Sequence, residues 1–163
     1  MIPQKEHFLS KISLQMKQAI VNGIVHTGDE ILNKAVVIIE NGIIISVQNE
    51  IPEAVNLIDL KGKHLSAGFI DIQINGGQKL YFSQYPTEET IQDIYETSLK
   101  FGTTHTLPCL ISSSNETILQ GIEAIRSYRT KHNNGVMGMH LEGPFLNPLK
   151  RGAHSPDRKS TRL

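Results

Sequence analysis

The sequence has little cysteine, no excess charge of either sign and no long apolar run, and each absence excludes a class of protein. Cys109 is the single cysteine, which excludes an intramolecular disulfide framework and fits a reducing cytoplasm. Lysine plus arginine and aspartate plus glutamate are balanced at 16 each, so there is no basic footprint for nucleic acid. Asn41 and Gly42 interrupt the most apolar stretch, residues 36–47, so no membrane span is predicted.

What is present fits a globular protein. The 163 residues are 39% hydrophobic and 20% charged, which suits one domain or two small ones. The N-terminus lacks the charged-then-apolar order of a signal peptide. Met16 stands directly before the first strand-like run, so we expect residues 1–15 to be a loose extension and Met16 to be the natural start.

Short β-strands are predicted up to residue 65. Asn41 and Gly42 separate two runs of β-branched residues, and this pair signals a hairpin because a type I′ turn needs positive φ at both central positions. Lys61 and Gly62 form a similar turn pair. Closely spaced antiparallel strands predict part of a small β-sandwich domain over residues 16–65. The predicted strands are residues 19–27, 35–40, 43–47 and 56–60.

After residue 65 the pattern becomes strand, helix, strand, helix, strand. Thr87 is expected to cap the first helix, and Ser113 with Glu116 has capping-box spacing at the start of the second. The predicted strands are residues 68–75, 103–111 and 136–142. The predicted apolar faces are Ile91, Ile94, Tyr95 and Leu99 on the first helix, and Ile118, Leu119, Ile122 and Ile125 on the second. This order predicts an α/β region over residues 66–156 that begins a parallel sheet or a (β/α)₈ barrel.

Polar side chains stand where these strands end, which is where reactive groups gather in such folds. Gln73 and Asn75 close the first strand and Glu142 closes the third. A carboxylate at this position, before a Gly-Pro turn, is well placed to bind Zn²⁺ or Fe²⁺ if imidazoles complete the shell. Position alone favours a capping or salt-bridged carboxylate for Glu142. Hydrogen bonds to loop backbone would equally explain Gln73 and Asn75.

The remaining polar candidates each have a structural alternative. His154 is also explained as a solvated loop histidine, and His140, within an apolar strand, as a satisfied core histidine. Lys150 and Arg151 suit either an anionic substrate group or a solvated pair. Cys109 has no partner visible in the sequence, so no role is predicted for it.

Two sequence motifs favour a functional explanation of these residues over a structural one. The stretch GFIDIQINGG at residues 68–77, followed by HLEGPFLNPLKRGAH at residues 140–154, resembles the N-acetylglucosamine-6-phosphate deacetylase branch of the amidohydrolase superfamily. The resemblance covers roughly residues 16–156. It implies a metal-dependent TIM barrel, preceded by part of a small β-sandwich domain, of which this chain would hold the first three strands and two helices.

The resemblance also implies a chemistry and a set of site residues. The reaction would be hydrolysis of N-acetyl-D-glucosamine 6-phosphate to D-glucosamine 6-phosphate and acetate by a metal-activated water. Glu142 would bind the metal, and Ala153 and His154 would contact the substrate. Superfamily members with two metals usually carry His-x-His where this chain has Gln73-x-Asn75. One main Zn²⁺ or Fe²⁺ site per subunit is therefore expected, with Gln73 and Asn75 lining the pocket or supporting a weak second ion.

Further implications concern what lies outside the chain. A TIM barrel takes about 250 residues, so the catalytic aspartate and two histidine ligands are expected beyond residue 163. Residues 157–163 are encoded by a nucleotide string that resembles a sequencing adapter, and we expect them to be non-native. Residues 1–163 alone should then be unstable and inactive. The full enzyme would be a cytoplasmic homodimer of amino-sugar metabolism that acts on a phosphorylated amino sugar, with no nucleic-acid or membrane partner.

Two alternatives remain open at this point. Another amidohydrolase, such as a dihydroorotase- or hydantoinase-like cyclic-amide hydrolase, would share the barrel, but it would usually carry His-x-His in place of Gln73-x-Asn75. A non-enzymatic β-sandwich module would explain the early strands but not the polar groups at the later strand ends.

Overall fold

The computed structural model describes residues 17–143, 146–152 and 154. The chain divides into two compact units, Met1–Ala67 and Gly68–Leu163, and each is described by itself. The expectations for residues 1–15 and 157–163 concern segments outside the described residues.

The first unit consists of short strands in two sheets. A four-stranded sheet has the order β5-β4-β1-β6, and a three-stranded sheet has the order β3-β2-β7. The strands are β1 (Gln18–Val21), β2 (Ile24–His26), β3 (Ile31–Leu32), β4 (Val36–Glu40), β5 (Ile43–Gln48), β6 (Asn56–Asp59) and β7 (His64–Ser66).

The predicted hairpin is confirmed. Asn41 and Gly42 have φ angles of 53° and 78°, and they join the antiparallel pair β4 and β5. The predicted turn at Lys61 and Gly62 is also confirmed, with φ angles of 52° and 80°.

Two features of this unit differ from the sequence prediction. The run at residues 19–27 is not one strand, because the backbone turns at Asn22 (φ 56°) and the chain passes from one sheet to the other. The strands are also not all antiparallel, since β1 pairs with β6, and β2 with β7, in parallel. These pairings join strands far apart in sequence, so hairpin signals cannot reveal them.

Strand β4 is buried on both faces. Val36 and Ile38 pack in one cluster with Ala19 and Val21, and Val37 packs in a second cluster. The second cluster contains side chains from both sheets: Ile20, Val25, Leu32, Ala35, Val37 and Leu65. The two sheets therefore share one core, and the continuous apolar sequence of β4 follows from this double burial.

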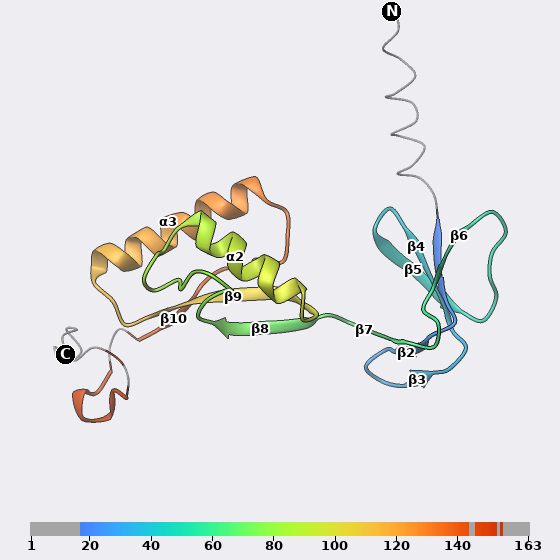
Figure 1. The fold of residues 1–163 in the computed structure, drawn as a ribbon, viewed down its shortest axis with the longest axis horizontal. Helices are drawn as coiled ribbons and strands as arrows, with labels where there is room; N and C mark the ends of the chain where they lie inside the picture. Colours follow the sequence, from blue (N-terminus) through green and yellow to red (C-terminus); the bar gives the residue numbers. More distant parts are fainter. Residues whose placement is uncertain (1–16, 144–145, 153, 155–163) are drawn as a thin grey trace, which may run out of the picture. The chain divides into compact units, whose positions relative to one another are not determined.

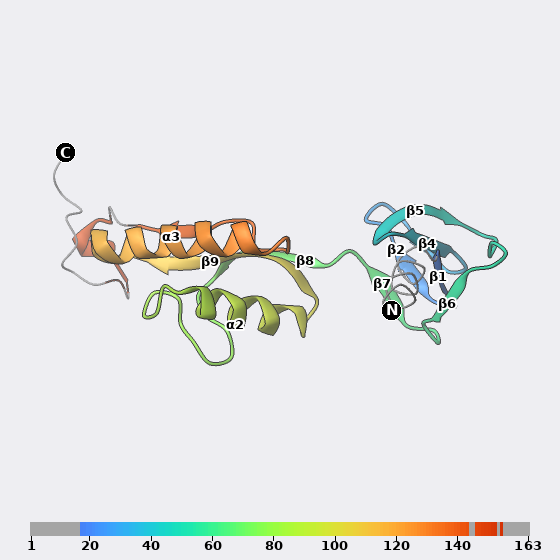
Figure 2. The same ribbon diagram turned by 90° about the horizontal axis from the view of Figure 1, so that it is seen from above.

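The second unit is a three-stranded parallel sheet with two crossover helices. The sheet has the order β10-β9-β8, and both helices lie on the same side of it (Figure 1; Figure 2 gives the view from above). The elements are β8 (Phe69–Ile74), α2 (Glu88–Leu99), β9 (Thr103–Ile111), α3 (Asn115–Lys131), β10 (His140–Glu142) and a 3₁₀ turn η1 (Pro148–Lys150). Strand β10 is shorter than predicted, because Val136 joins β9 only through an isolated bridge to Thr106.

The two helix starts test the capping predictions. Thr87 caps α2 as predicted, with its Oγ1 accepting a hydrogen bond from the Thr90 amide at 3.3 Å. For α3 the prediction was wrong by one residue. Ser114 is the cap and accepts from the Thr117 amide at 3.2 Å, whereas the Ser113 hydroxyl donates to the Ile111 carbonyl at 2.8 Å.

The predicted apolar face of α3 was also wrong in part. Leu119 and Ile122 are 64% and 37% exposed, while Gly121, Ile125 and Tyr128 are buried. A Cβ at position 121 would lie 2.7 Å from Leu110 Cδ1, so glycine permits the close contact between α3 and the sheet. Glycine carries no apolar signal, which explains why the sequence pattern selected a face rotated away from the core.

One core joins the helices to the sheet. It contains Phe82, Ile91, Ile94, Leu110, Ile125, Tyr128 and Val136. Strand β8, at the edge of the sheet, keeps large apolar side chains exposed: Phe69 at 67%, Ile70 at 61% and Ile72 at 63%. In the described part of the chain, no helix is long and apolar enough to cross a membrane.

Candidate functional site

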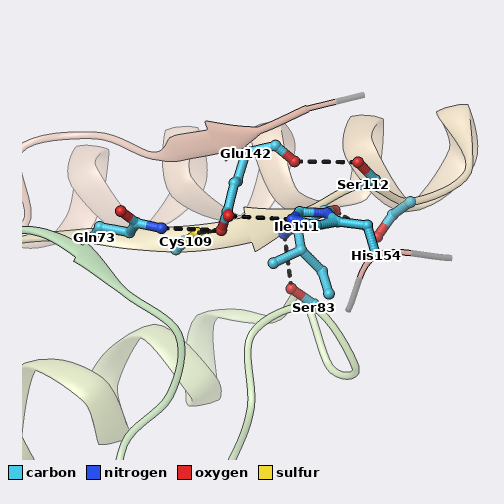
Figure 3. Close-up of polar contacts among 8 residues, drawn as sticks. Gln73, Ser83, Cys109, Ile111, Ser112, Glu142 and His154 are labelled. Atoms are coloured by element: carbon cyan, nitrogen blue, oxygen red, sulfur yellow. Dashed lines mark hydrogen bonds and ion pairs between the residues drawn. The ribbon is translucent and has the colours of Figure 1, made fainter. Parts of the chain in front are cut away.

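Side chains from all three strands of the second unit meet at the carboxyl end of the sheet. Leu110 packs into the core beneath the helices, so its neighbour Cys109 points to the opposite face of the sheet. Gln73 of β8 and Glu142 of β10 meet Cys109 on that face (Figure 3). The site therefore lies on the face that the two helices leave uncovered.

The Glu142 carboxylate is the centre of this cluster. Its Oε2 atom accepts a hydrogen bond from Gln73 Nε2 at 3.0 Å and one from the Cys109 thiol at 3.5 Å (Figure 3). Its Oε1 atom lies 3.2 Å from His154 Nε2. Three segments that are distant in sequence thus converge on one carboxylate.

His154 reaches Glu142 from the loop after β10. The Arg151 guanidinium donates a hydrogen bond to the His154 backbone carbonyl, which fixes the course of this loop. Earlier in the same loop, Asn147 Oδ1 accepts from the Leu149 amide at 2.9 Å and caps η1. Ala153, predicted to contact the substrate, lies outside the described residues.

Two serines anchor the end of β9 beside the site. The Ser112 hydroxyl donates to the Glu142 backbone carbonyl at 3.4 Å, and Ser83 Oγ accepts from the Ile111 amide at 3.0 Å. The first contact holds the backbone of the carboxylate residue itself. The second ties the loop between β8 and α2 to the same strand end.

Burial and hydrogen bonding act in opposite directions on Glu142. Desolvation raises its pKa, but the hydrogen bonds from His154, Cys109 and Gln73 outweigh it, so the pKa lies below the usual value. Desolvation, with the contact to Glu142, raises the pKa of Cys109 to about 11. At neutral pH the site therefore holds an ionised carboxylate and a protonated thiol.

Among the described residues, three buried polar side-chain atoms have no hydrogen-bond partner, and two of them, those of Asn75 and His154, lie near the carboxyl ends of the strands. The three atoms are Asn75 Oδ1, Thr106 Oγ1 and His154 Nδ1. Buried polar atoms are normally paired, so atoms left unpaired at strand ends point to a ligand, water or ion.

The structure brings together Gln73, Glu142 and His154 among the residues selected from the sequence. Asn75 lies two residues after Gln73, but its buried Oδ1 has no hydrogen-bond partner and does not contact the carboxylate. Cys109 was not selected from the sequence as a site residue, although its side chain is fully buried and contacts Glu142. The register of β9 beside β10 and the alternation of β9 side chains are the signals that would have identified it.

The donor set fits one side of a divalent-metal site. A carboxylate and an imidazole are ligand types that Zn²⁺ takes, and hydrogen bonds that orient a ligating carboxylate are the usual outer support. Within the described residues, no group of three or more His, Cys, Asp or Glu side chains is arranged to hold a metal ion. Further ligands would have to come from outside this part of the chain.

Residues 18–65 match the NagA composite domain. An N-acetylglucosamine-6-phosphate deacetylase of Haemophilus influenzae is 39% identical over 144 residues, which are 87% of this chain and 38% of the relative. An N-acetylgalactosamine-6-phosphate deacetylase of Shewanella sp. (strain ANA-3) is 40% identical over 92 residues, 56% of this chain and 23% of the relative.

A solved structure shows the same fold. The crystal structure of N-acetylglucosamine-6-phosphate deacetylase from Pasteurella multocida matches with a TM-score of 0.82 at 34% identity, over 86% of this chain and 38% of that chain. The chain thus spans about two fifths of the length of the Haemophilus influenzae and Pasteurella multocida proteins. The resemblance predicted from the two sequence motifs is confirmed.

Proposed function

Because the chain is related to the N-acetylglucosamine-6-phosphate deacetylases, we propose that the complete protein removes the acetyl group from an N-acetylated amino-sugar phosphate. The preferred substrate is N-acetyl-D-glucosamine 6-phosphate, and the products are D-glucosamine 6-phosphate and acetate. A cyclic-amide hydrolase is not favoured, because the deacetylases are the relatives that share this fold and sequence.

The observation that carries this proposal is the convergence on Glu142. The carboxylate ends β10, Gln73 approaches from β8, and His154 approaches from the loop after β10. A capping residue or a surface ion pair would not need contacts from three separate segments. The arrangement suits a binding centre at the carboxyl ends of parallel strands.

A divalent metal held by Glu142 would polarise a bound water and lower its pKa toward neutrality. The chain's own residues would do the rest of the work on this side of the site. Gln73 orients the carboxylate, and the Arg151 contact holds the His154 loop against it. His154, whose Nδ1 is buried and unpaired, would offer a polar contact to the sugar phosphate.

We also propose that the second unit begins a (β/α)₈ barrel. Its strands follow one another in space in the order of the sequence, and both crossover helices lie on one side of the sheet. A doubly wound sheet places helices on both sides, whereas a barrel keeps them all outside. The exposed edge strand β8 would then pair with the last strand of the barrel.

The remaining features of the proposal follow from the resemblance noted in the sequence. The complete protein would be a cytoplasmic homodimer, with one main Zn²⁺ or Fe²⁺ site in each subunit. Ala153 and His154 would contact the substrate, and the catalytic base would come from another part of the complete protein. Light scattering of the purified protein would test the dimer.

Acetate release from the two epimeric substrates tests the activity. The complete protein, loaded with Zn²⁺ or Fe²⁺, should hydrolyse N-acetyl-D-glucosamine 6-phosphate faster than N-acetyl-D-galactosamine 6-phosphate. Residues 1–163 alone should show no turnover, because their described part lacks a three-ligand metal group. A folded, metal-loaded complete protein that releases acetate from neither sugar would overturn the proposal.

A further inference from the structure

We propose that Gln73 and Cys109 are positioning residues that together fix the Glu142 carboxylate for metal binding. This inference rests on the proposed metal site, and it concerns two residues that touch the carboxylate rather than the metal. It assigns a function to Cys109, and it assigns Gln73 a different one from metal ligation.

Both donors act on the same carboxylate oxygen. Gln73 Nε2 and Cys109 Sγ lie 3.0 Å and 3.5 Å from Oε2 of Glu142, whereas Oε1 faces His154. Two donors on one oxygen set both the tilt and the rotation of the carboxylate plane. Among the described residues, Oε1 is held by the imidazole alone, and it is the oxygen that remains to be presented to a cation (Figure 3).

The two donors are themselves held on ordered backbone. Cys109 is fully buried in β9, which pairs on one side with β8 and on the other with β10. The amide N–H of Gln73 donates to Asp71 Oδ1 at 2.9 Å, so the backbone before the side chain is fixed as well. A donor on rigid strands can orient a partner more exactly than one on a loop.

The direction of the Gln73 amide argues against a direct role as ligand. Its NH₂ group faces Glu142, and an amide nitrogen that donates a hydrogen bond does not bind a cation. A ligating Gln73 would turn its carbonyl oxygen toward the metal and would give up this hydrogen bond. Outer-shell donors of this kind are worth about 10–100-fold in metal affinity.

The experiment measures Co²⁺ affinity of the complete protein by competition with a chelator, and records the visible ligand-field spectrum of the Co²⁺ form. The variants are Gln73→Met, Cys109→Ala and Cys109→Ser. Gln78→Met is the matched control, because Gln78 lies in the exposed loop after β8 and contacts Lys100 rather than the site. Thermal unfolding by circular dichroism establishes that each variant is folded.

We expect Gln73→Met to weaken Co²⁺ binding by about 10–100-fold, with an unchanged ligand-field spectrum. Cys109→Ala should weaken binding by less than about 10-fold, because a thiol is a weak donor, and Cys109→Ser should restore it. Gln78→Met should leave the affinity unchanged.

Three results with these variants would overturn the inference. One is wild-type affinity in both Gln73→Met and Cys109→Ala. Another is a ligand-field spectrum that changes in Gln73→Met, since Gln73 would then be a ligand. The third is a thiolate-to-cobalt charge-transfer band in the wild-type protein that disappears in Cys109→Ala, since Cys109 would then bind the metal.

These readouts do not depend on turnover. A protein that binds Co²⁺ through Glu142 with the expected variant pattern, yet deacetylates no sugar phosphate, would remove the proposed activity and keep the inference. A protein that deacetylates the sugar phosphate, but whose variants all keep the wild-type Co²⁺ affinity, would keep the proposed activity and remove the inference. A wild-type protein that binds no Co²⁺ would overturn the inference.

Discussion

The two units of this chain use their strands for different purposes. In the first unit, strand β4 is covered on both faces, and its neighbours contribute small and branched apolar side chains to two clusters. In the second unit, the helices cover one face of the sheet, and the uncovered face collects Gln73, Cys109 and Glu142 at the carboxyl ends. The first unit also has a polar contact between neighbouring strands, from His26 Nε2 to His64 Nδ1 at 2.7 Å, but this contact is exposed to solvent.

This difference shows which strand faces can carry side chains that bind a ligand. A strand buried on both faces, as β4 is, has no free side chain to offer a ligand. A parallel sheet covered on one face leaves alternate side chains of every strand free at one end.

Glu142→Gln should remove metal binding by the second unit without unfolding it. Removing the ligating charge should weaken metal binding by more than 100-fold, since outer-shell partners alone are worth about 10–100-fold. Chelator competition on the complete protein measures this affinity. Glu123→Gln is the control, because Glu123 forms an exposed pair with Arg126. Equal affinities in the two variants would contradict the placement of the site.

Ile125→Ala should destabilise the second unit far more than Leu119→Ala, although both residues are on α3. Ile125 is 7% exposed and Leu119 is 64% exposed. The expected loss in free energy of unfolding is about 2–5 kcal/mol for Ile125→Ala and within about 0.5 kcal/mol for Leu119→Ala. Urea denaturation followed by circular dichroism checks both values, and an equally large loss for Leu119→Ala would restore the apolar face predicted from the sequence, which includes both residues.

Gly135→Ala should destabilise the connection from α3 to β10. A Cβ at this position would lie 1.7 Å from the Thr104 carbonyl oxygen, so backbone has to move. We expect a loss of about 1–3 kcal/mol in the free energy of unfolding. At Gly138, three residues later, a Cβ would meet Leu107 at an ordinary 3.5 Å, and Gly138→Ala should cost less in the same denaturation series.

Gly42→Ala should produce the smallest of these effects, confined to the first unit. Gly42 has a φ of 78°, and an L-residue costs about 1–2 kcal/mol in that left-handed region. Amide hydrogen exchange in β4 and β5 should quicken, while exchange in β9 stays unchanged. Faster exchange in β9 would show that the two units do not unfold separately.

The sequence predicted those features that depend on neighbouring residues. The Asn41–Gly42 hairpin, the Thr87 cap and the bounds of β9 all follow from local chemistry, and the structure confirms them. The inner face of α3 was misplaced because its contact with the sheet is made through Gly121. The parallel pairings of β1 with β6 and β2 with β7 depend on distant segments, so no local signal marks them.

The candidate site shows the same limit. Glu142 and Gln73 could be selected because they end predicted strands, and His154 because of the motif that contains it. Cys109 could not, because its partner lies 33 residues away and only the register of β9 and β10 brings the two together. Predicting that contact requires the pairing of strands, not the pattern within one strand.

Anomalous diffraction at the zinc absorption edge, from crystals of the complete protein, tests the central claim most directly. The account predicts a zinc peak about 2.0–2.2 Å from a carboxylate oxygen of Glu142, with Gln73 Nε2 still donating to the other oxygen. A zinc site elsewhere, with both oxygens of Glu142 still occupied by hydrogen bonds from Gln73, Cys109 and His154, would contradict it.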